Sequence, residues 1–153
     1  MSELKERLRA DLTASMKARD ELTTATLRMV LTAVQIEEVA GDRARQLTDE
    51  EILGVLRREM KKRREAATAF ADAGRVESAA RERAESQVLE TYLPSQLSDD
   101  ELADLVRAAI GQSGASGMRA LGQVIKATQA GADGRAEGGR IAAEARRQLG
   151  ANE

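Results

Sequence analysis

The stretch ETYLPSQLSDDEL, residues 90–102, decides how this chain is divided. It holds the single tyrosine of the sequence, Tyr92, and the single proline, Pro94. Proline disfavours helical backbone in the residue before it and cannot donate a backbone hydrogen bond, so a helix is expected to end here. Ser98 and Glu101 then form the S-x-x-E pattern of a capping box, which predicts the start of the next helix.

We therefore expect an N-terminal helical domain, a hinge and a C-terminal domain, over residues 1–93, 94–97 and 98–153. The alternative is one continuous helical array with a kink at Pro94. Helix length favours the division, because four mostly long predicted helices precede the proline and three short ones follow it.

Apolar residues recur every three or four positions along almost the whole chain, which predicts amphipathic helices. Phe70 and Tyr92 are the only aromatic residues, so the core must be aliphatic, and this suits closely packed helices better than a sheet. The expected fold class is all-α, with an N-terminal bundle of about four helices plus a C-terminal three-helix domain. The predicted helices are 3–19, 21–40, 49–73, 76–93, 99–111, 117–130 and 138–149.

Several residues have predicted local roles. Thr48 and Ser116 are expected to cap the helices that follow them, and Gly41 and Gly74 to end or break helices. The helix at 21–40 is apolar on two sides, which is typical of a central helix in a bundle.

Two polar side chains are expected to be partly buried. Arg63 points into the apolar sector of its helix, so its guanidinium should meet a carboxylate, for example from the helix at 76–93. Tyr92 should pack its ring at the domain junction, while its hydroxyl finds a partner or water.

The composition excludes several kinds of site. The 153 residues contain no cysteine and no histidine, which excludes disulfides, a thiolate nucleophile, an imidazole base and the usual zinc ligands. We see no catalytic constellation and expect no cofactor and no metal. No apolar run approaches the ~18 residues of a membrane span, and the charged start carries no signal-peptide pattern, so we expect a cytoplasmic protein away from the membrane. The Arg- and Ala-rich usage suggests a bacterial source.

The chain has 24 basic and 26 acidic residues, so its net charge does not attract nucleic acid or an anionic membrane. Two local clusters of basic residues remain as candidates. The first cluster is RREMKKRRE, residues 57–65, whose cations sweep an arc opposite the apolar stripe of the helix. This arc could bind a phosphate backbone, or it could be a solvated face paired with neighbouring carboxylates. Its candidate RNA-binding residues are Arg57, Arg58, Lys61, Lys62 and Arg64.

The second cluster lies in residues 116–153, which carry six basic and four acidic residues. The glycine-rich loop at 131–139 would let the backbone approach a ligand closely, and a mildly basic helical unit suits structured RNA that is read by shape and phosphates. The other interpretation is a plain turn between helices. The candidate RNA-binding residues here are Arg119, Lys126, Arg135, Arg140, Arg146 and Arg147.

Four segments resemble the YqeY-like proteins, also called the GatB/YqeY family. They are TLRMVLTAV, EMKKRREAATAFADAGR, AESQVLETYLPSQLSDDEL and MRALGQVIKATQAGADGRAEGGR, and the resemblance spans nearly the whole chain. The resemblance implies a C-terminal domain similar to the tail of the B subunit of glutamine-dependent aminoacyl-tRNA amidotransferases. It also implies carbon–nitrogen ligase activity with glutamine as amido donor, or a role beside such an enzyme.

The predicted function is a non-catalytic helical module that binds tRNA or assists tRNA-linked amidation. Its expected partners are tRNA and an aminoacyl-tRNA amidotransferase or another protein. The alternative is a protein–protein adaptor of helical-bundle type with no RNA role. A third hypothesis, an enzyme in its own right, predicts ammonia release from glutamine by the pure chain, which we do not expect.

Overall fold

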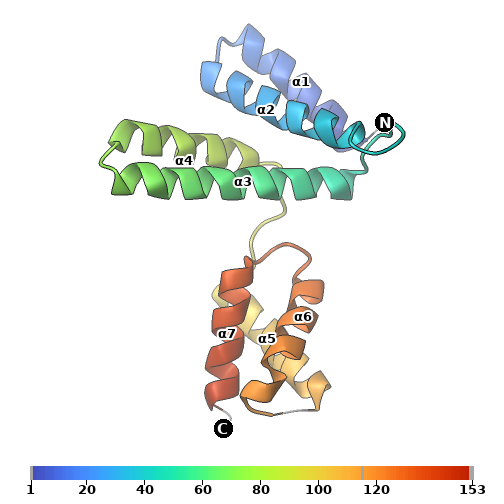
Figure 1. The fold of residues 1–153 in the computed structure, drawn as a ribbon, viewed down its shortest axis with the longest axis vertical. Helices are drawn as coiled ribbons and strands as arrows, with labels where there is room; N and C mark the ends of the chain where they lie inside the picture. Colours follow the sequence, from blue (N-terminus) through green and yellow to red (C-terminus); the bar gives the residue numbers. More distant parts are fainter. Residues whose placement is uncertain (1, 115, 152–153) are drawn as a thin grey trace. The chain divides into compact units, whose positions relative to one another are not determined.

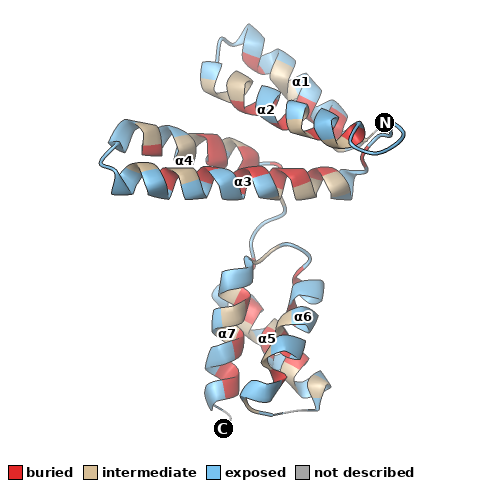
Figure 2. Ribbon diagram, viewed as in Figure 1, coloured by how far each residue is buried: buried red, intermediate tan, exposed pale blue. Residues whose placement is uncertain are grey.

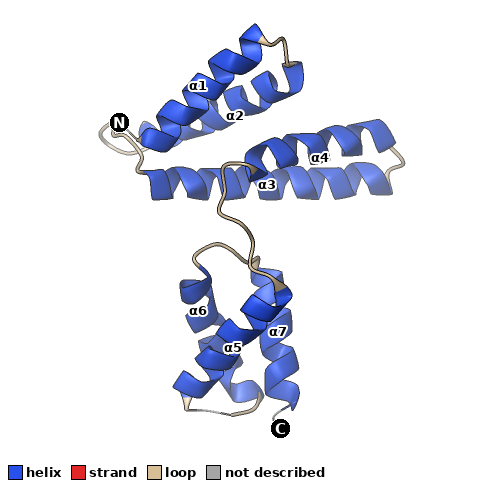
Figure 3. Ribbon diagram, turned by 180° about the vertical axis from the view of Figure 1, so that it is seen from behind, coloured by secondary structure: helices blue, strands red, loops and turns tan. Residues whose placement is uncertain are grey.

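The computed structural model describes residues 2–114 and 116–151, and these residues form helices and loops with no strand (Figures 1 and 3). The expected all-α class is confirmed. Each predicted helix is present with ends shifted by a few residues, and the sixth begins with a short 3-10 turn. The elements are α1 (Glu3–Lys17), α2 (Glu21–Glu38), α3 (Asp49–Asp72), α4 (Val76–Glu90), α5 (Asp99–Ser113), η1 (Met118–Ala120), α6 (Leu121–Ala132) and α7 (Gly138–Ala151).

The chain divides into two compact units, with the division between Leu93 and Pro94. The first unit consists of two helical hairpins, α1–α2 and α3–α4 (Figure 1). The second contains α5, η1, α6 and α7, and each of its three α-helices packs against the other two. Each unit has its own aliphatic core, visible in Figure 2 as buried residues on facing helix sides.

Helix α2 contacts the other three helices of the first unit, as its two apolar sides predicted. Only one of those two apolar sides is fully buried. Leu27 and Val30 are completely buried, whereas Met29 and Ile36 on the other side are 39% and 61% exposed.

Both predicted capping boxes are present. The Thr48 and Ser98 side chains accept the backbone N–H of Glu51 and Glu101, and each glutamate accepts the backbone N–H of its cap residue in return. A capping residue of this kind stabilises a helix by about 1 kcal/mol relative to alanine.

Two other predicted helix signals were wrong, and one is confirmed. Helix α2 ends at Glu38, before Gly41, and Gly41 does not adopt the positive φ of a helix-ending glycine. Ser116 caps no helix: η1 begins after Gly117, which has φ +70° and no side-chain cap. Gly74 follows the C-cap of α3 and adopts φ +76°, so it interrupts the helical backbone between α3 and α4 as predicted.

The prediction for Arg63 is confirmed. Its buried guanidinium lies 2.8 Å from Glu59 on its own helix and 3.5 Å from Glu85 on α4. Arg63 also donates to the sulfur of Met29 on α2, so this one side chain links three helices.

The hydroxyl of Tyr92 donates to Asp11 Oδ2 at 2.5 Å, which confirms that it has a partner. The Arg7 guanidinium lies 4.7 Å from the centre of the ring. Burial and the bond to the Asp11 carboxylate both raise the pKa of Tyr92 above its usual range. The ring belongs to the core of the first unit, where it links the segment after α4 to α1; its predicted place at a domain junction stays a prediction.

Candidate nucleic-acid interface

Three acidic residues of the second unit are clustered at the start of one helix. Asp99, Asp100 and Glu101 all lie in the first turn of α5, where negative side chains complement the helix dipole. From Leu105 to Ala132 the sequence then contains no acidic residue. The segment through η1 and α6 is therefore the part of this unit where an anionic ligand meets the least repulsion.

Two of the sequence-predicted cations bind the unit's own chain. Arg135 donates from Nε to the carbonyl of Ser95 at 2.8 Å, and its own carbonyl accepts the N–H of Leu97 at 2.7 Å. Arg140 donates to the carbonyl of Leu97 at 2.9 Å and pairs with Asp99 at 3.1 Å. The glycine-rich loop at 131–139 and the start of α7 thus hold the segment that enters α5.

Arg147 also has an internal partner. It forms two bonds to the carboxylate of Glu144, at 2.9 and 2.5 Å, and Gln148 donates to the same carboxylate at 2.8 Å. These hydrogen bonds lower the pKa of Glu144 to about 2. A cation so engaged contributes little additional attraction for a distant phosphate.

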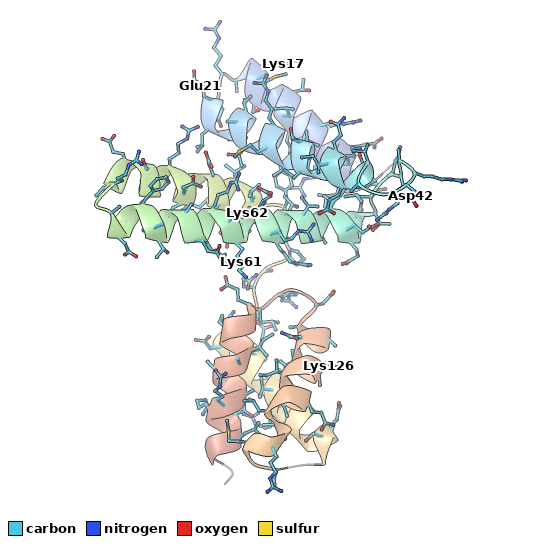
Figure 4. All side chains as sticks on the ribbon, viewed as in Figure 1. Lys17, Glu21, Asp42, Lys61, Lys62 and Lys126 are labelled. Carbon is cyan, nitrogen blue, oxygen red and sulfur yellow. The ribbon has the colours of Figure 1, made fainter. Side chains whose placement is uncertain are left out.

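Three predicted cations of this unit remain exposed. Arg119 lies in η1, Lys126 in α6 and Arg146 in α7, and the structure gives none of them a carboxylate partner among the described residues. Helix α7 packs against η1, so the elements that carry Arg119 and Arg146 are neighbours. Figure 4 shows Lys126 on α6. These three side chains are the cations of the second unit available to a ligand.

In the first unit the basic arc on α3 is largely paired. Arg58 forms an ion pair with Glu37 of α2, and Lys62 lies 3.3 Å from Glu59. Arg57 is half-buried, and both Arg57 and Arg64 have interactions within the protein. Lys61 leaves α3 on a different side from Lys62 (Figure 4). The contacts favour the interpretation of this arc as a solvated, ion-paired helix face.

Two searches of the described residues bear on the kind of site. Residues 2–114 and 116–151 contain no group of three or more acidic side chains placed to hold a metal ion. None of the helices they form is long and apolar enough to cross a membrane.

Sequence reasoning missed the internal use of Arg135 and Arg140. Their partners are about 40 residues away in the sequence, so no local pattern points to them.

Comparison with known proteins gives a consistent result. The family model described as Yqey-like protein matches residues 5–149 of the chain. A protein of Schizosaccharomyces pombe described as uncharacterized is 32% identical over 92 residues, which cover 60% of this chain and 73% of the yeast protein.

Proposed function

Because the chain belongs to the YqeY-like protein family, we propose that it is a non-catalytic helical module that binds tRNA in the cytoplasm. We further propose that it acts beside a glutamine-dependent amidotransferase, which would supply the carbon–nitrogen ligase chemistry that the family label implies. The proposal assigns no catalytic step to this chain.

The observation that carries the proposal is a set of three exposed cations in the second unit. Arg119, Lys126 and Arg146 project from three elements that pack together, and no carboxylate among the described residues neutralises them. Phosphate contacts of this kind position a protein on folded RNA without reading its sequence. In the first unit, Arg58 and Lys62 of the basic arc are instead ion-paired.

The test is a titration of the full chain with tRNA at low and moderate salt. Saturable binding that weakens as salt rises is expected, because phosphate contacts release counterions. The variants Arg119→Ala, Lys126→Ala and Arg146→Ala should each weaken binding and lower the slope of log affinity against log salt by about one.

The matched control is Arg107→Ala. Arg107 is an exposed cation of the same unit that is paired with Asp104 at 2.7 Å, so its loss changes the net charge equally but removes no candidate contact. Binding indifferent to salt, or three variants that behave like this control, would sink the proposal.

One observation favours the alternative of a protein–protein adaptor. Ile36 and Val39 lie three residues apart at the end of α2 and are 61% and 59% exposed. These two side chains offer a small apolar surface for a protein partner to cover. A protein partner captured equally well after nuclease treatment, and lost in Ile36→Ser, would favour the adaptor over the RNA-binding module.

A further inference from the structure

Two exposed methionines of the first unit accept hydrogen bonds from arginine through their sulfur atoms. Met16 of α1 accepts from Nη2 of Arg28 at 3.2 Å, and Met29 of α2 accepts from Nη2 of Arg63 at 3.1 Å. The two methionines are 44% and 39% exposed, so a small oxidant in the solvent can reach both. A thioether is a weak hydrogen-bond acceptor, so both guanidinium groups have a poor partner at this donor.

The two arginines differ in burial. Arg28 is exposed, so water can complete the hydrogen bonding of its guanidinium, whereas the Arg63 side chain is only 9% exposed. Nη1 of Arg63 donates to Glu59, but the buried Nε lies 3.5 Å from Glu85 without forming a hydrogen bond to any described residue. A buried donor without a good acceptor destabilises a fold, so a stronger acceptor in place of the Met29 sulfur would stabilise this unit.

Oxidation by a peroxide creates such an acceptor. The thioether sulfur attacks one oxygen of hydrogen peroxide, the O–O bond breaks and an S–O bond forms. The second oxygen leaves as hydroxide and takes the proton of the first to become water. The sulfur loses two electrons and the peroxide gains them. The product is a sulfoxide, whose oxygen carries partial negative charge and is a much stronger acceptor for a guanidinium than the sulfur was.

The surroundings of Met29 suit this polar product. At 39% exposure the sulfoxide keeps contact with water, so it is not transferred into an apolar environment. Met60, in the core of the same unit, is 4% exposed, and a sulfoxide at that position would disrupt the packing. Met29 therefore combines access to an oxidant with a buried donor that its oxidised form can satisfy.

We propose that Met29 is a site of reversible oxidation by peroxides, and that its sulfoxide strengthens the link between α2 and α3 by accepting from Nη2 of Arg63. A methionine sulfoxide reductase reverses the step, with two thiols that become a disulfide as the reductant and water as the second product. The site lies in the first unit and does not depend on RNA binding by the second.

The first experiment treats the full chain with hydrogen peroxide and measures the oxidation of each methionine by mass spectrometry of tryptic peptides. The four methionines of the described residues lie in separate tryptic peptides, so each is measured by itself. Met29 should be oxidised while Met60 stays a thioether. Methionine sulfoxide reductases with dithiothreitol should then return Met29 to the thioether.

The second experiment measures the stability of the first unit before and after oxidation. Urea unfolding is followed by the fluorescence of Tyr92, the single tyrosine, which lies in the core of this unit. Oxidation should raise the urea midpoint by roughly 1 M, the shift that one hydrogen bond to a charged group gives in a small domain.

Two variants separate Met29 from the other methionines. Met29→Leu keeps an apolar side chain of similar volume without the sulfur, so peroxide should leave its midpoint unchanged. Met16→Leu is the matched control, because it removes the sulfur beside the exposed Arg28, and its midpoint should still rise by roughly 1 M. Met29 is partly exposed, so its replacement should leave the fold intact, and circular dichroism checks this.

Three results would overturn the proposal. One is a Met29 that stays a thioether under conditions that oxidise Met16, and another is a midpoint that is unchanged or lower once Met29 is oxidised. The third is an equal midpoint shift in Met29→Leu and the unaltered chain. Binding of tRNA is a separate measurement on the second unit, so its failure would leave this proposal standing.

Discussion

Replacing Arg63 by methionine should destabilise the first unit strongly. The Arg63 side chain is 9% exposed, and its partners Glu59 and Glu85 are 11% and 8% exposed, so the substitution leaves two carboxylates buried without their shared cation. Removing one partner of a buried ion pair costs about 3–5 kcal/mol. Lys62 lies 3.3 Å from Glu59 and Arg81 lies 3.2 Å from Glu85, so each carboxylate keeps an exposed partner and we expect the lower end of that range, about 3 kcal/mol. The apolar methionine retains most of the packing volume, so the loss is electrostatic rather than a cavity effect.

The same helix provides a matched control. Arg58 also forms an ion pair, with Glu37, but the two side chains are 58% and 41% exposed. An exposed pair contributes about 0–1 kcal/mol, so Arg58→Met should have little effect. The two variants lose the same charge and gain the same side chain, and they differ only in the burial of the pair.

The assay is urea unfolding followed by tyrosine fluorescence. Tyr92 is the single tyrosine and lies in the core of the first unit, so its signal reports that unit alone. With a slope of about 1 kcal/mol per M urea for a small domain, Arg63→Met should lower the midpoint by roughly 3 M and Arg58→Met by less than about 1 M. Equal midpoint shifts in the two variants would refute the assignment of Arg63 as a buried electrostatic link.

Two further predictions concern the second unit. Gly122→Ala should stabilise α6 by up to about 1 kcal/mol, because the added Cβ meets open space. Gly131→Ala should stabilise it less, because its Cβ would lie 3.0 Å from the Leu105 side chain. Thermal unfolding of the two variants tests this order. The folded-state pKa of Glu144 is about 2, below the ordinary 4.5, so its bond to Arg147 stabilises the second unit fully above pH 4.5. This stabilisation is lost as the pH falls toward 2. In Glu144→Gln the stability of the unit should fall less over this range, which NMR spectra recorded across a pH titration would show.

Much of the fold could be predicted from the sequence, because helix signals are local. The capping boxes at Thr48 and Ser98 act over three residues, and both were found from their pattern alone. Arg63 was predicted correctly for the same reason: its angular position on α3 follows from the helix period.

The errors occur where a local signal competes with another one. Ser116 is a good capping residue, but the positive φ of Gly117 turns the chain before η1 begins, so the serine side chain never reaches the first turn. Gly41 comes too late, because α2 has already ended at Glu38, with Val39 as its C-cap.

The candidate site was less predictable than the fold, because the partners of a surface arginine are set by tertiary contacts. Arg135 and Arg140 lie in a glycine-rich loop and at the start of the next helix, which made them look like ligand-binding residues. The structure uses both to hold Ser95 and Leu97, and the whole of the predicted hinge at 94–97 falls within the second unit. The predicted hinge at 94–97 and the glycine-rich loop at 131–139 are therefore bonded to each other and form one structural feature.

This pairing changes which residues should be tested first for RNA binding. An arginine bonded to a backbone carbonyl must give up that bond to reach a phosphate, and its replacement would also loosen the entry to α5. A loss of RNA affinity in Arg135→Ala or Arg140→Ala would thus have two explanations. Arg119, Lys126 and Arg146 have no such internal role among the described contacts, so a loss of affinity in their variants points directly to a phosphate contact.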